Sequence, residues 1–283
     1  DFRTHRATAI NFWQSCGAQR TACSALNRER AAGIMAAAQC ASAGESLPAD
    51  VWNAAFATES AQREIPLISL AEMGVHLDPD EMLSSSKLRQ LKSGAEAYPF
   101  ADDEAKVVYK LFNLRGASCS EKPKGWLGKR VILQSLGDGF EITLCDATLT
   151  DTLEKLMVLN DAGAHPTEIV GLSDDGKFMI AKQPLALPYV DFKKDRKDGL
   201  AAIRATVPPF TRLHREIGVF WLQEQAWIIC DLHNGNIMRT RENQPTIIDA
   251  LIGRLPVEFF SELAWAREAY EDSRALRLGL PLI

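Results

Sequence analysis

From Lys87 onward the chain carries a series of short β-type runs, and this series is the strongest constraint on the fold. The runs that show β character are Ala105–Phe112, Val131–Leu136, Phe140–Leu144, Glu168–Leu172 and Lys177–Gln183. Turn-forming residues separate them, at Asp102-Asp103, Gly137-Asp138-Gly139 and Asp174-Asp175-Gly176. Such punctuation by Gly and Asp is typical of strands joined by tight turns.

One helix interrupts these strands between the third and the fourth run. It is expected to begin with Thr148 or Thr150 as its N-cap and to end at Gly163. After the last β-type run, the sequence from Lys193 to Trp227 is typical of helices. Strands, one helix, more strands and then helices predict an α+β fold with a strand-rich first half and a helical second half.

Composition narrows the class of protein. Hydrophobic residues make up 46% and charged residues 24% of the 283 residues, which is typical of a soluble globular protein with one large domain or two modest ones. The net charge of −5 argues against a dedicated nucleic-acid binder. No apolar run reaches membrane-spanning length, and no signal peptide is recognised at the start. Six cysteines without a CxxC pair predict reduced thiols and a cytoplasmic location.

The first part of the chain shows no chemistry. Residues 1–62 are rich in Ala, Gln, Arg and Ser, and helices are expected over Thr21–Ala43 and from Ser46 onward. The segment 64–83 is punctuated by prolines and a glycine and is interpreted as a connector with one short strand or helix. The expected domains are therefore an N-terminal helical region and connector, 1–83, and a second domain, 84–283. The aromatic residues expected inside the helical region are Phe12, Trp13, Trp52 and Phe56.

The segment that carries chemistry runs from Ile229 to Met238. An apolar segment, interpreted as a helix end, delivers Asp231 to a loop, and Asn236 follows five residues later. A further β-type run then ends in Asp249. Carboxylate and amide oxygens are the hard donors that hold Mg²⁺ together with substrate phosphates. A chance Asp, Asn and Asp in loops is the alternative reading.

Asp231-Leu-His-Asn-Gly-Asn236, followed by an apolar run ending in Asp249, resembles the kinase superfamily. The Asp-Leu-His motif is closer to that of small-molecule and atypical kinases than to that of ordinary protein kinases. The resemblance implies that Asp231 orients or deprotonates the attacking hydroxyl. It also implies that Asn236 and Asp249 hold Mg²⁺ on the phosphates of ATP. His233 stands where protein kinases place a lysine, and it is either a donor to the transferred phosphate or a packing residue.

The same resemblance assigns roles upstream. Kinases use a strand lysine to grip the nucleotide phosphates, and Lys110 stands in the middle of an apolar run. A lysine among such neighbours is costly unless it meets an anion, although a solvated strand face is the alternative. Gly94 would lie in the phosphate-covering loop, which has one glycine where kinases have three. Glu154 would pair with the strand lysine, with Glu141 and Asp151 as rivals, and Gln183 would lie in the hinge that reads adenine through backbone groups.

A Gly94-Ala-Glu96 loop precedes the Val108-Tyr-Lys110 run, and the stretches Leu159–Gly163, Pro166–Gly171 and Ala181–Leu185 follow. Together they resemble the kinase-like domains of phage and mobile-element polyvalent proteins, over about residues 87–255. The resemblance implies a two-lobe fold, with an N-lobe of about 87–183 and a reduced C-lobe of about 184–283. Ala250-Leu251 replaces the usual Phe-Gly after Asp249, and no peptide-binding subdomain follows. Three readings remain open: an active ATP- and Mg-dependent phosphotransferase acting on a protein or small-molecule hydroxyl, a nucleotide-binding pseudokinase, and a helical interaction protein with a chance motif. Nucleotidyl transfer is a further possibility.

Overall fold

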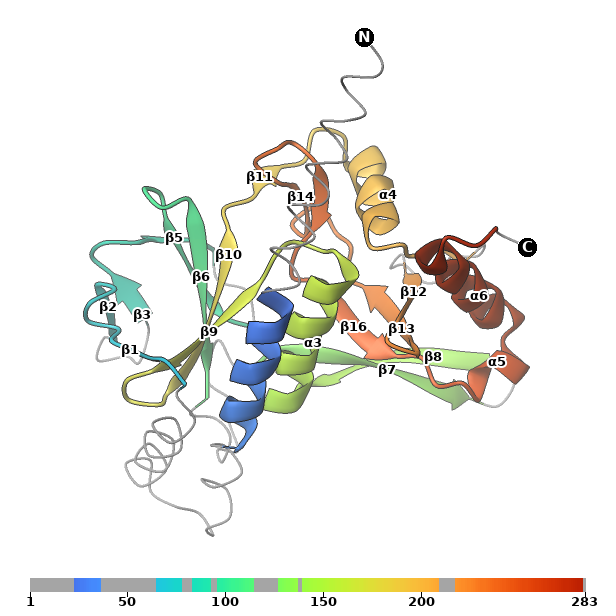
Figure 1. Cartoon of the computed structure of the whole chain (residues 1–283), viewed down its shortest axis with the longest axis horizontal. Helices are drawn as coiled ribbons and strands as arrows, with labels where there is room; N and C mark the ends of the chain where they lie inside the picture. The colour runs from blue at the N-terminus through green and yellow to red at the C-terminus, as the bar shows by residue number, and fades with distance from the viewer. Residues whose placement is uncertain are drawn as a thin grey trace. The chain divides into compact units, whose positions relative to one another are not determined.

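The computed structural model describes residues 23–36, 65–77, 83–92, 96–114, 127–136, 139–208 and 217–281. They form a mixed α+β protein that divides into two compact units, and each unit is built from two separate stretches of the chain (Figure 1). Unit 1 takes its described residues from 1–126 and 166–183. Unit 2 takes its described residues from 127–165 and 184–283. The stretch 127–165 thus falls within the segment expected to form the N-lobe.

Unit 1 contains a six-stranded mixed sheet in the order β1-β9-β10-β6-β5-β4. Its strands are β1 (Leu67–Ile68), β4 (Arg89–Gln90), β5 (Tyr98–Asp102), β6 (Val107–Asn113), β9 (Glu168–Ser173) and β10 (Phe178–Pro184). A separate hairpin joins β2 (Val75–Leu77) to β3 (Leu83–Ser85). The buried residues that hold these strands together include Val75, Leu83, Tyr98, Phe100, Leu111, Phe178 and Ile180. Three of the expected β-type runs, Ala105–Phe112, Glu168–Leu172 and Lys177–Gln183, correspond to β6, β9 and β10.

The segment expected to be a connector is part of this sheet. β1 pairs in parallel with β9, and Leu172 donates its N–H to the carbonyl of Pro66 at 3.1 Å. The two segments of the chain approach so closely that a Cβ on Gly171 would lie 2.1 Å from the carbonyl oxygen of Pro66. Pro66 therefore belongs to unit 1, and β1 is the short strand that the expected connector was predicted to contain.

Residues 23–36 form a helix that belongs to unit 1. The buried Asn27 side chain donates to the carbonyl of Thr167 at 2.7 Å and accepts from the N–H of Ile169 at 2.8 Å. The amide thereby takes the place of a neighbouring strand at the start of β9. This helix confirms part of the expected Thr21–Ala43 helix. The second helix from Ser46 and the expected packing of Phe12, Trp13, Trp52 and Phe56 lie outside the described residues.

Unit 2 contains the other helices and two three-stranded sheets, in the orders β12-β13-β16 and β11-β14-β15, and a β7–β8 hairpin. The strands are β7 (Lys129–Leu136), β8 (Gly139–Asp146), β11 (Leu187–Pro188), β12 (Gly218–Leu222), β13 (Gln225–Cys230), β14 (Ile237–Arg239), β15 (Pro245–Ile247) and β16 (Leu251–Arg254). The helices are α3 (Leu149–Ala162), α4 (Phe192–Ala202), α5 (Phe259–Glu262) and α6 (Ala264–Leu278).

Helix α3 confirms the expected boundaries. Thr148 is the N-cap: its side chain accepts the N–H of Asp151, and the Asp151 carboxylate accepts the N–H of Thr148 in return. This reciprocal arrangement satisfies two donors that the helix itself leaves without partners. Gly163 ends the helix with φ of 108°, a left-handed conformation that glycine adopts without strain.

The expected helix from Lys193 to Trp227 is confirmed as far as Ala202, where α4 ends, and is wrong over 218–227. There the chain forms the hairpin β12–β13, which turns at Gln223 and Glu224 with φ of 52° and 58°. Phe220, Leu222, Trp227 and Ile229 enter one hydrophobic core, while Val219, Ala226, Ile228 and Cys230 enter another. Because both faces of this sheet are buried, the strands read as one continuous apolar run, which periodicity alone does not distinguish from a buried helix.

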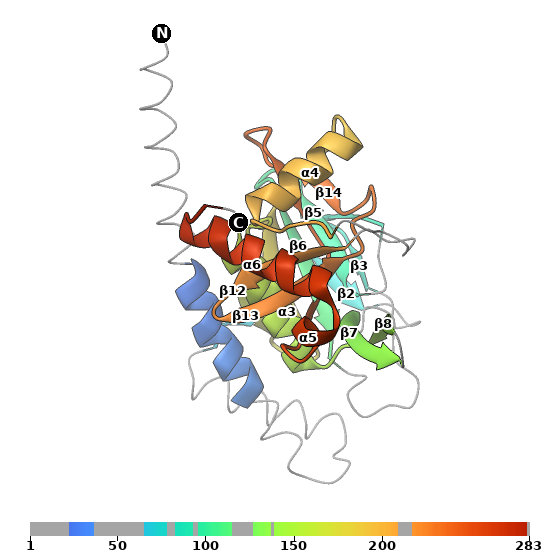
Figure 2. The ribbon, with the colours of Figure 1, turned by 90° about the vertical axis from the view of Figure 1, so that its right-hand side faces the viewer.

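Helix α6 covers β12 within unit 2 (Figure 2). Its buried Ser273 accepts the N–H of Trp221 at 2.8 Å and donates to the carbonyl of Arg204 at 2.7 Å. Arg277, one turn later, donates to the carbonyls of Ile203 at 2.7 Å and Ala162 at 3.3 Å. Burial lowers the pKa of Arg277 to about 10, and the neighbouring charge of Arg204 adds to this shift. The last helix thus satisfies carbonyls at the C-terminal ends of α4 and α3.

Candidate active site

Two strand pairings bring the candidate metal ligands together in unit 2. In the first, Cys230 at the end of β13 lies opposite Leu251 at the start of β16. Asp231 follows the first of these residues directly, and Asp249 precedes the second by two positions. Neighbouring strands lie about 4.8 Å apart, so the register alone holds the main chains of the two aspartates close to each other.

The second pairing adds Asn236. Ile237 at the start of β14 lies opposite Ile247 at the end of β15, and Ile248 donates its N–H to the carbonyl of Asn236 at 2.9 Å. Asn236 therefore lies beside the residue that immediately precedes Asp249. The hairpin β14–β15 thus closes the loop between β13 and β16, and the three candidate residues lie at the points where these strands meet.

Asn236 joins the two aspartates directly. Its buried side-chain amide Nδ2 donates to the carbonyl of Asp231 at 2.9 Å and to the carbonyl of Asp249 at 3.4 Å. A carbonyl only accepts, so these contacts determine which end of the amide is the nitrogen. Oδ1 then points away from both carbonyls. The amide oxygen is thereby presented as a hard ligand, and the donor chemistry of the three side chains fits Mg²⁺.

Both aspartates have a strained backbone. The φ angles are 63° at Asp231 and 50° at Asp249, in the left-handed region that non-glycine residues seldom adopt. Asp tolerates this region better than most residues, at a cost on the order of 1 kcal/mol. Each strained residue stands at an end of a buried strand, where the chain leaves the sheet. Strain of this kind persists where the surrounding structure holds a side chain in a required direction.

His233 lies on the exposed side of the same loop. Its Nδ1 accepts the N–H of Gly235 at 2.9 Å, and Nε2 lies 3.9 Å from Oδ2 of Asp231. An Nδ1 that accepts leaves the proton of the neutral imidazole on Nε2. The side chain is 56% exposed, so it is available to a ligand and contributes no packing to the core.

A buried ion pair joins β14 to α4. Arg239 donates from Nε and Nη2 to the two carboxylate oxygens of Asp195, each at 2.6 Å, and Asp195 also accepts the N–H of Val190 at 2.9 Å. The hydrogen bonds from Arg239 hold the pKa of Asp195 at about 2, because they stabilise the charged carboxylate more than its complete burial destabilises it. This ion pair was not predicted from the sequence. Asp195 is an ordinary acidic residue in the first turn of a helix, and no local pattern indicates that it pairs with an arginine on a strand 44 residues later.

Lys110 and Gln183 belong to unit 1. Lys110 lies on β6 opposite Pro99 and is 7% exposed. It therefore does not lie on a solvated face of the strand, which was the alternative interpretation. Gln183 is also buried, and its Nε2 donates to Oγ1 of Thr167 at 2.6 Å. Gly94, the expected phosphate-loop glycine, lies outside the described residues.

Glu154 lies on α3 in unit 2, where its carboxylate accepts a hydrogen bond from Arg254 of β16. Its two rivals have other surroundings: Glu141 lies opposite Gln134 in the β7–β8 hairpin, and Asp151 caps α3 and pairs with Arg130 at 3.3 Å. Arg254 was not singled out from the sequence. A charged residue at the end of an apolar strand gives no signal of a partner 100 positions earlier.

Among the described residues, no group of three or more His, Cys, Asp or Glu side chains is placed to hold a metal ion. The candidate site contains only two such side chains, Asp231 and Asp249, and its third oxygen ligand is the amide of Asn236. Comparisons with family models, curated proteins and solved structures find no match. Within the described chain, no helix is both long enough and apolar enough to cross a membrane.

Proposed function

We propose that the chain is an ATP- and Mg-dependent, kinase-like phosphotransferase that moves the γ-phosphoryl group to a hydroxyl on a protein or small molecule. The observation that carries this proposal is the convergence of Asp231, Asn236 and Asp249, joined by the Asn236 amide at 2.9 Å and 3.4 Å. Metal-assisted phosphoryl transfer needs little covalent chemistry from the protein. It needs positioned oxygen ligands and a base or orienting group beside the acceptor.

Each residue has one role in this proposal. Oδ1 of Asn236 and the carboxylate of Asp249 hold Mg²⁺, which when bound neutralises the charge on the nucleotide phosphates. Asp231 orients the acceptor hydroxyl and accepts its proton. Nε2–H of His233, on the same loop, donates to an oxygen of the transferred group. Lys110 grips the other phosphates of ATP, and Gln183 lies in the segment that contacts adenine.

The experiment is transfer of label from γ-labelled ATP to a panel of hydroxyl acceptors, with and without Mg²⁺. Asp231→Ala is expected to lower transfer at least a hundredfold while MgATP still raises the melting temperature. Asp249→Asn is expected to weaken both transfer and the Mg-dependent stabilisation. Glu242→Gln, in the exposed turn between β14 and β15, is the matched control and keeps both. Transfer that survives Asp231→Ala would refute the role of this residue.

A nucleotide-binding pseudokinase or scaffold module of a larger phage or mobile-element protein is the second candidate. The observation that favours it is the pairing of Glu154 with Arg254, because the acid proposed to hold Lys110 already has a cationic partner. This candidate predicts stabilisation by MgATP without transfer from any acceptor in the panel. Label placed at the α-phosphate separates nucleotidyl transfer from both. Absence of any nucleotide effect favours an interaction protein in which the motif occurs by chance.

A further inference from the structure

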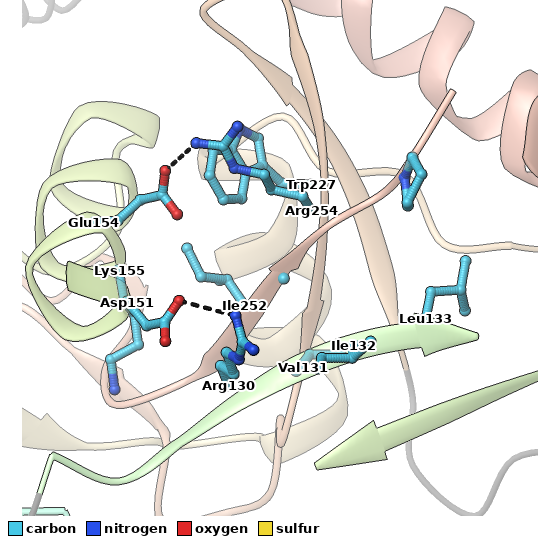
Figure 3. A pocket seen from close by; sticks show the side chains of 12 residues that line it. Arg130, Val131, Ile132, Leu133, Asp151, Glu154, Lys155, Trp227, Ile252 and Arg254 are labelled. Carbon is cyan, nitrogen blue, oxygen red and sulfur yellow. Dashed lines mark hydrogen bonds and ion pairs between the residues drawn. The ribbon is translucent and has the colours of Figure 1, made fainter. Parts of the chain in front are cut away.

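Contacts between distant parts of the chain differ in how firmly they can hold a segment. In the pocket between α3, β7 and β16, Asp151 pairs with Arg130 and Glu154 pairs with Arg254 (Figure 3). The two arginines are 45% and 62% exposed, and each matches one carboxylate, so these pairs are weak and select no ligand by charge. The long-range contacts of helix 23–36 in unit 1 include buried hydrogen bonds, and they lead to a residue of the proposed nucleotide site.

Helix 23–36 satisfies main-chain groups at the start of β9. The Asn27 amide donates to the carbonyl of Thr167 at 2.7 Å and accepts the N–H of Ile169 at 2.8 Å. Arg30, one turn later on the helix, donates to the carbonyl of Ile169 at 2.6 Å. Buried main-chain groups that lack a neighbouring strand need such partners. The helix therefore fixes the main chain at Thr167 and Ile169.

The same stretch at the start of β9 also holds the end of β10. Lys182 lies opposite Glu168 in the last pair that joins the two strands, and its ammonium lies 2.9 Å from the Glu168 carboxylate. Gln183, one residue further on, donates from Nε2 to Oγ1 of Thr167 at 2.6 Å, and both side chains are buried. Thr167 therefore contacts Asn27 through its carbonyl and Gln183 through its hydroxyl.

The Glu168 carboxylate adds a second link between the helix and β10. It accepts a hydrogen bond from Arg30 at 2.9 Å and pairs with Lys182 at the same distance. Burial acts against the charged carboxylate, but the hydrogen bonds from Lys182 and Arg30 together outweigh it and lower the pKa of Glu168. Glu168 is therefore ionised at neutral pH and joins a cation of the helix to a cation of the strand.

We propose that Asn27 is a positioning residue for nucleotide binding. Its side chain bonds to Thr167 and Ile169, neither of which is a proposed ligand of ATP. By fixing Thr167, it holds the side chain of Gln183 and with it the end of β10. This inference rests on the proposed function, in which Gln183 lies in the segment that contacts adenine. Loss of Asn27 weakens the binding of ATP and leaves the rate of transfer, which depends on Asp231 and the ligands of Mg²⁺.

The first measurement is amide hydrogen exchange over 181–183 in the full chain without nucleotide. Asn27→Ala is expected to speed exchange there by about tenfold or more, because the loss of both hydrogen bonds loosens Thr167. Glu29→Gln, exposed on the same helix, is the control and keeps the native rates. Unchanged rates in Asn27→Ala, with its fold checked by circular dichroism, would overturn the inference whether or not the chain binds ATP.

The second measurement is calorimetric titration of the same chains with MgATP, followed by steady-state transfer. Asn27→Ala is expected to raise Kd and KM for MgATP by about fivefold or more, while kcat stays within about twofold of the native value. An unchanged Kd despite faster exchange, or a loss confined to kcat, would overturn the positioning role alone. A native chain that binds no MgATP would refute the proposed function, and this role with it.

Thr167 offers a second pair of variants, which keeps the test decisive if Asn27→Ala does not fold. Thr167→Val removes the hydroxyl that accepts from Gln183 and keeps the carbonyl that accepts from Asn27, whereas Thr167→Ser keeps both. Thr167→Val is expected to weaken MgATP binding by about fivefold or more, and Thr167→Ser by less than about twofold. Equal losses in these two variants would overturn the inference.

The double variant of Asn27→Ala and Thr167→Val tests whether the two residues act in series. Because Asn27 is proposed to act through Thr167, the double variant is expected to bind MgATP about as weakly as the more affected single variant. Losses that multiply would show that the two residues act independently, and they would refute the proposed path from Asn27 to Gln183.

Discussion

Arg239 on β14 grips Asp195 on α4 with two hydrogen bonds of 2.6 Å each, and the Asp195 carboxylate is fully buried. We expect Asp195→Asn to destabilise the fold by about 3 kcal/mol at pH 7, because it leaves a cation without its buried counter-charge. Urea unfolding measures the loss. Asp198→Asn, on the same helix but in an exposed pair with Lys194, is the control and is expected to change stability by less than about 0.5 kcal/mol.

The same pair predicts a pH dependence. The pKa of Asp195 is about 2 in the folded chain, below the ordinary value of 3.8, so the unfolded chain binds the proton more readily. The stabilisation is present above about pH 4 and is lost as pH falls toward 2. The stability difference between the native chain and Asp195→Asn is therefore expected to narrow as pH falls from about 4 toward 2. A difference that stays constant over this range would contradict the assignment.

Asn236→Asp tests the link between the two aspartates. The substitution keeps the shape of the side chain but replaces Nδ2 by an oxygen, which would face the carbonyls of Asp231 and Asp249. Loss of the donors beside buried acceptors is expected to cost about 2 kcal/mol, measured by urea unfolding without nucleotide. Asn234→Asp, exposed on the same loop, is the control. Equal stability of the two variants would show that the Asn236 amide does not hold the loop.

Gly253→Ala tests the close approach of β7 and β16. A Cβ at this position would lie 2.1 Å from the carbonyl oxygen of Val131, so one backbone must move. We expect a loss of about 2–3 kcal/mol, seen as a lower melting temperature. Gly279→Ala makes a useful comparison: it meets no atom within 4 Å but has φ of 69°, and its cost is expected to be only about 1 kcal/mol.

Thr148→Ala removes one half of the capping arrangement at the start of α3. The Asp151 N–H then loses its side-chain acceptor, and the expected cost is about 1 kcal/mol in thermal or urea unfolding. Thr150→Ala, in the exposed first turn of the same helix, serves as the comparison and is expected to stay within about 0.5 kcal/mol of the native chain. Equal losses would argue that propensity, not capping, sets the start of α3.

Local signals predicted α3 and the runs corresponding to β6, β7, β8, β9 and β10 well. The N-cap Thr148 and the stop at Gly163 act within one turn of chain, so their physics is visible in a short window. The hairpin β12–β13 was not visible in this way. Its turn residues, Gln223 and Glu224, are not the Asn-Gly type that marks a two-residue turn, and both of its faces are buried.

The candidate site was also only partly predictable from the sequence. Asp231, Asn236 and Asp249 were predictable because their spacing is local, and the strand register brings them together. The partners of Asp195 and Glu154 were not, because each lies tens of positions away on a different element. Tertiary packing determines which cation pairs with which carboxylate, and this cannot be predicted from local patterns in a single sequence.

Each compact unit takes its chain from two places, since 127–165 is inserted between the stretches of unit 1 and 166–183 between those of unit 2. No single cut of the polypeptide can therefore release either unit whole. An expression fragment that begins at residue 184 would lack α3 and β7, and with them Glu154, the acid that pairs with Arg254. Dissecting this protein calls for joining the two stretches of one unit directly by a short linker in place of the stretch between them, because simple truncation would yield fragments that cannot complete their own cores.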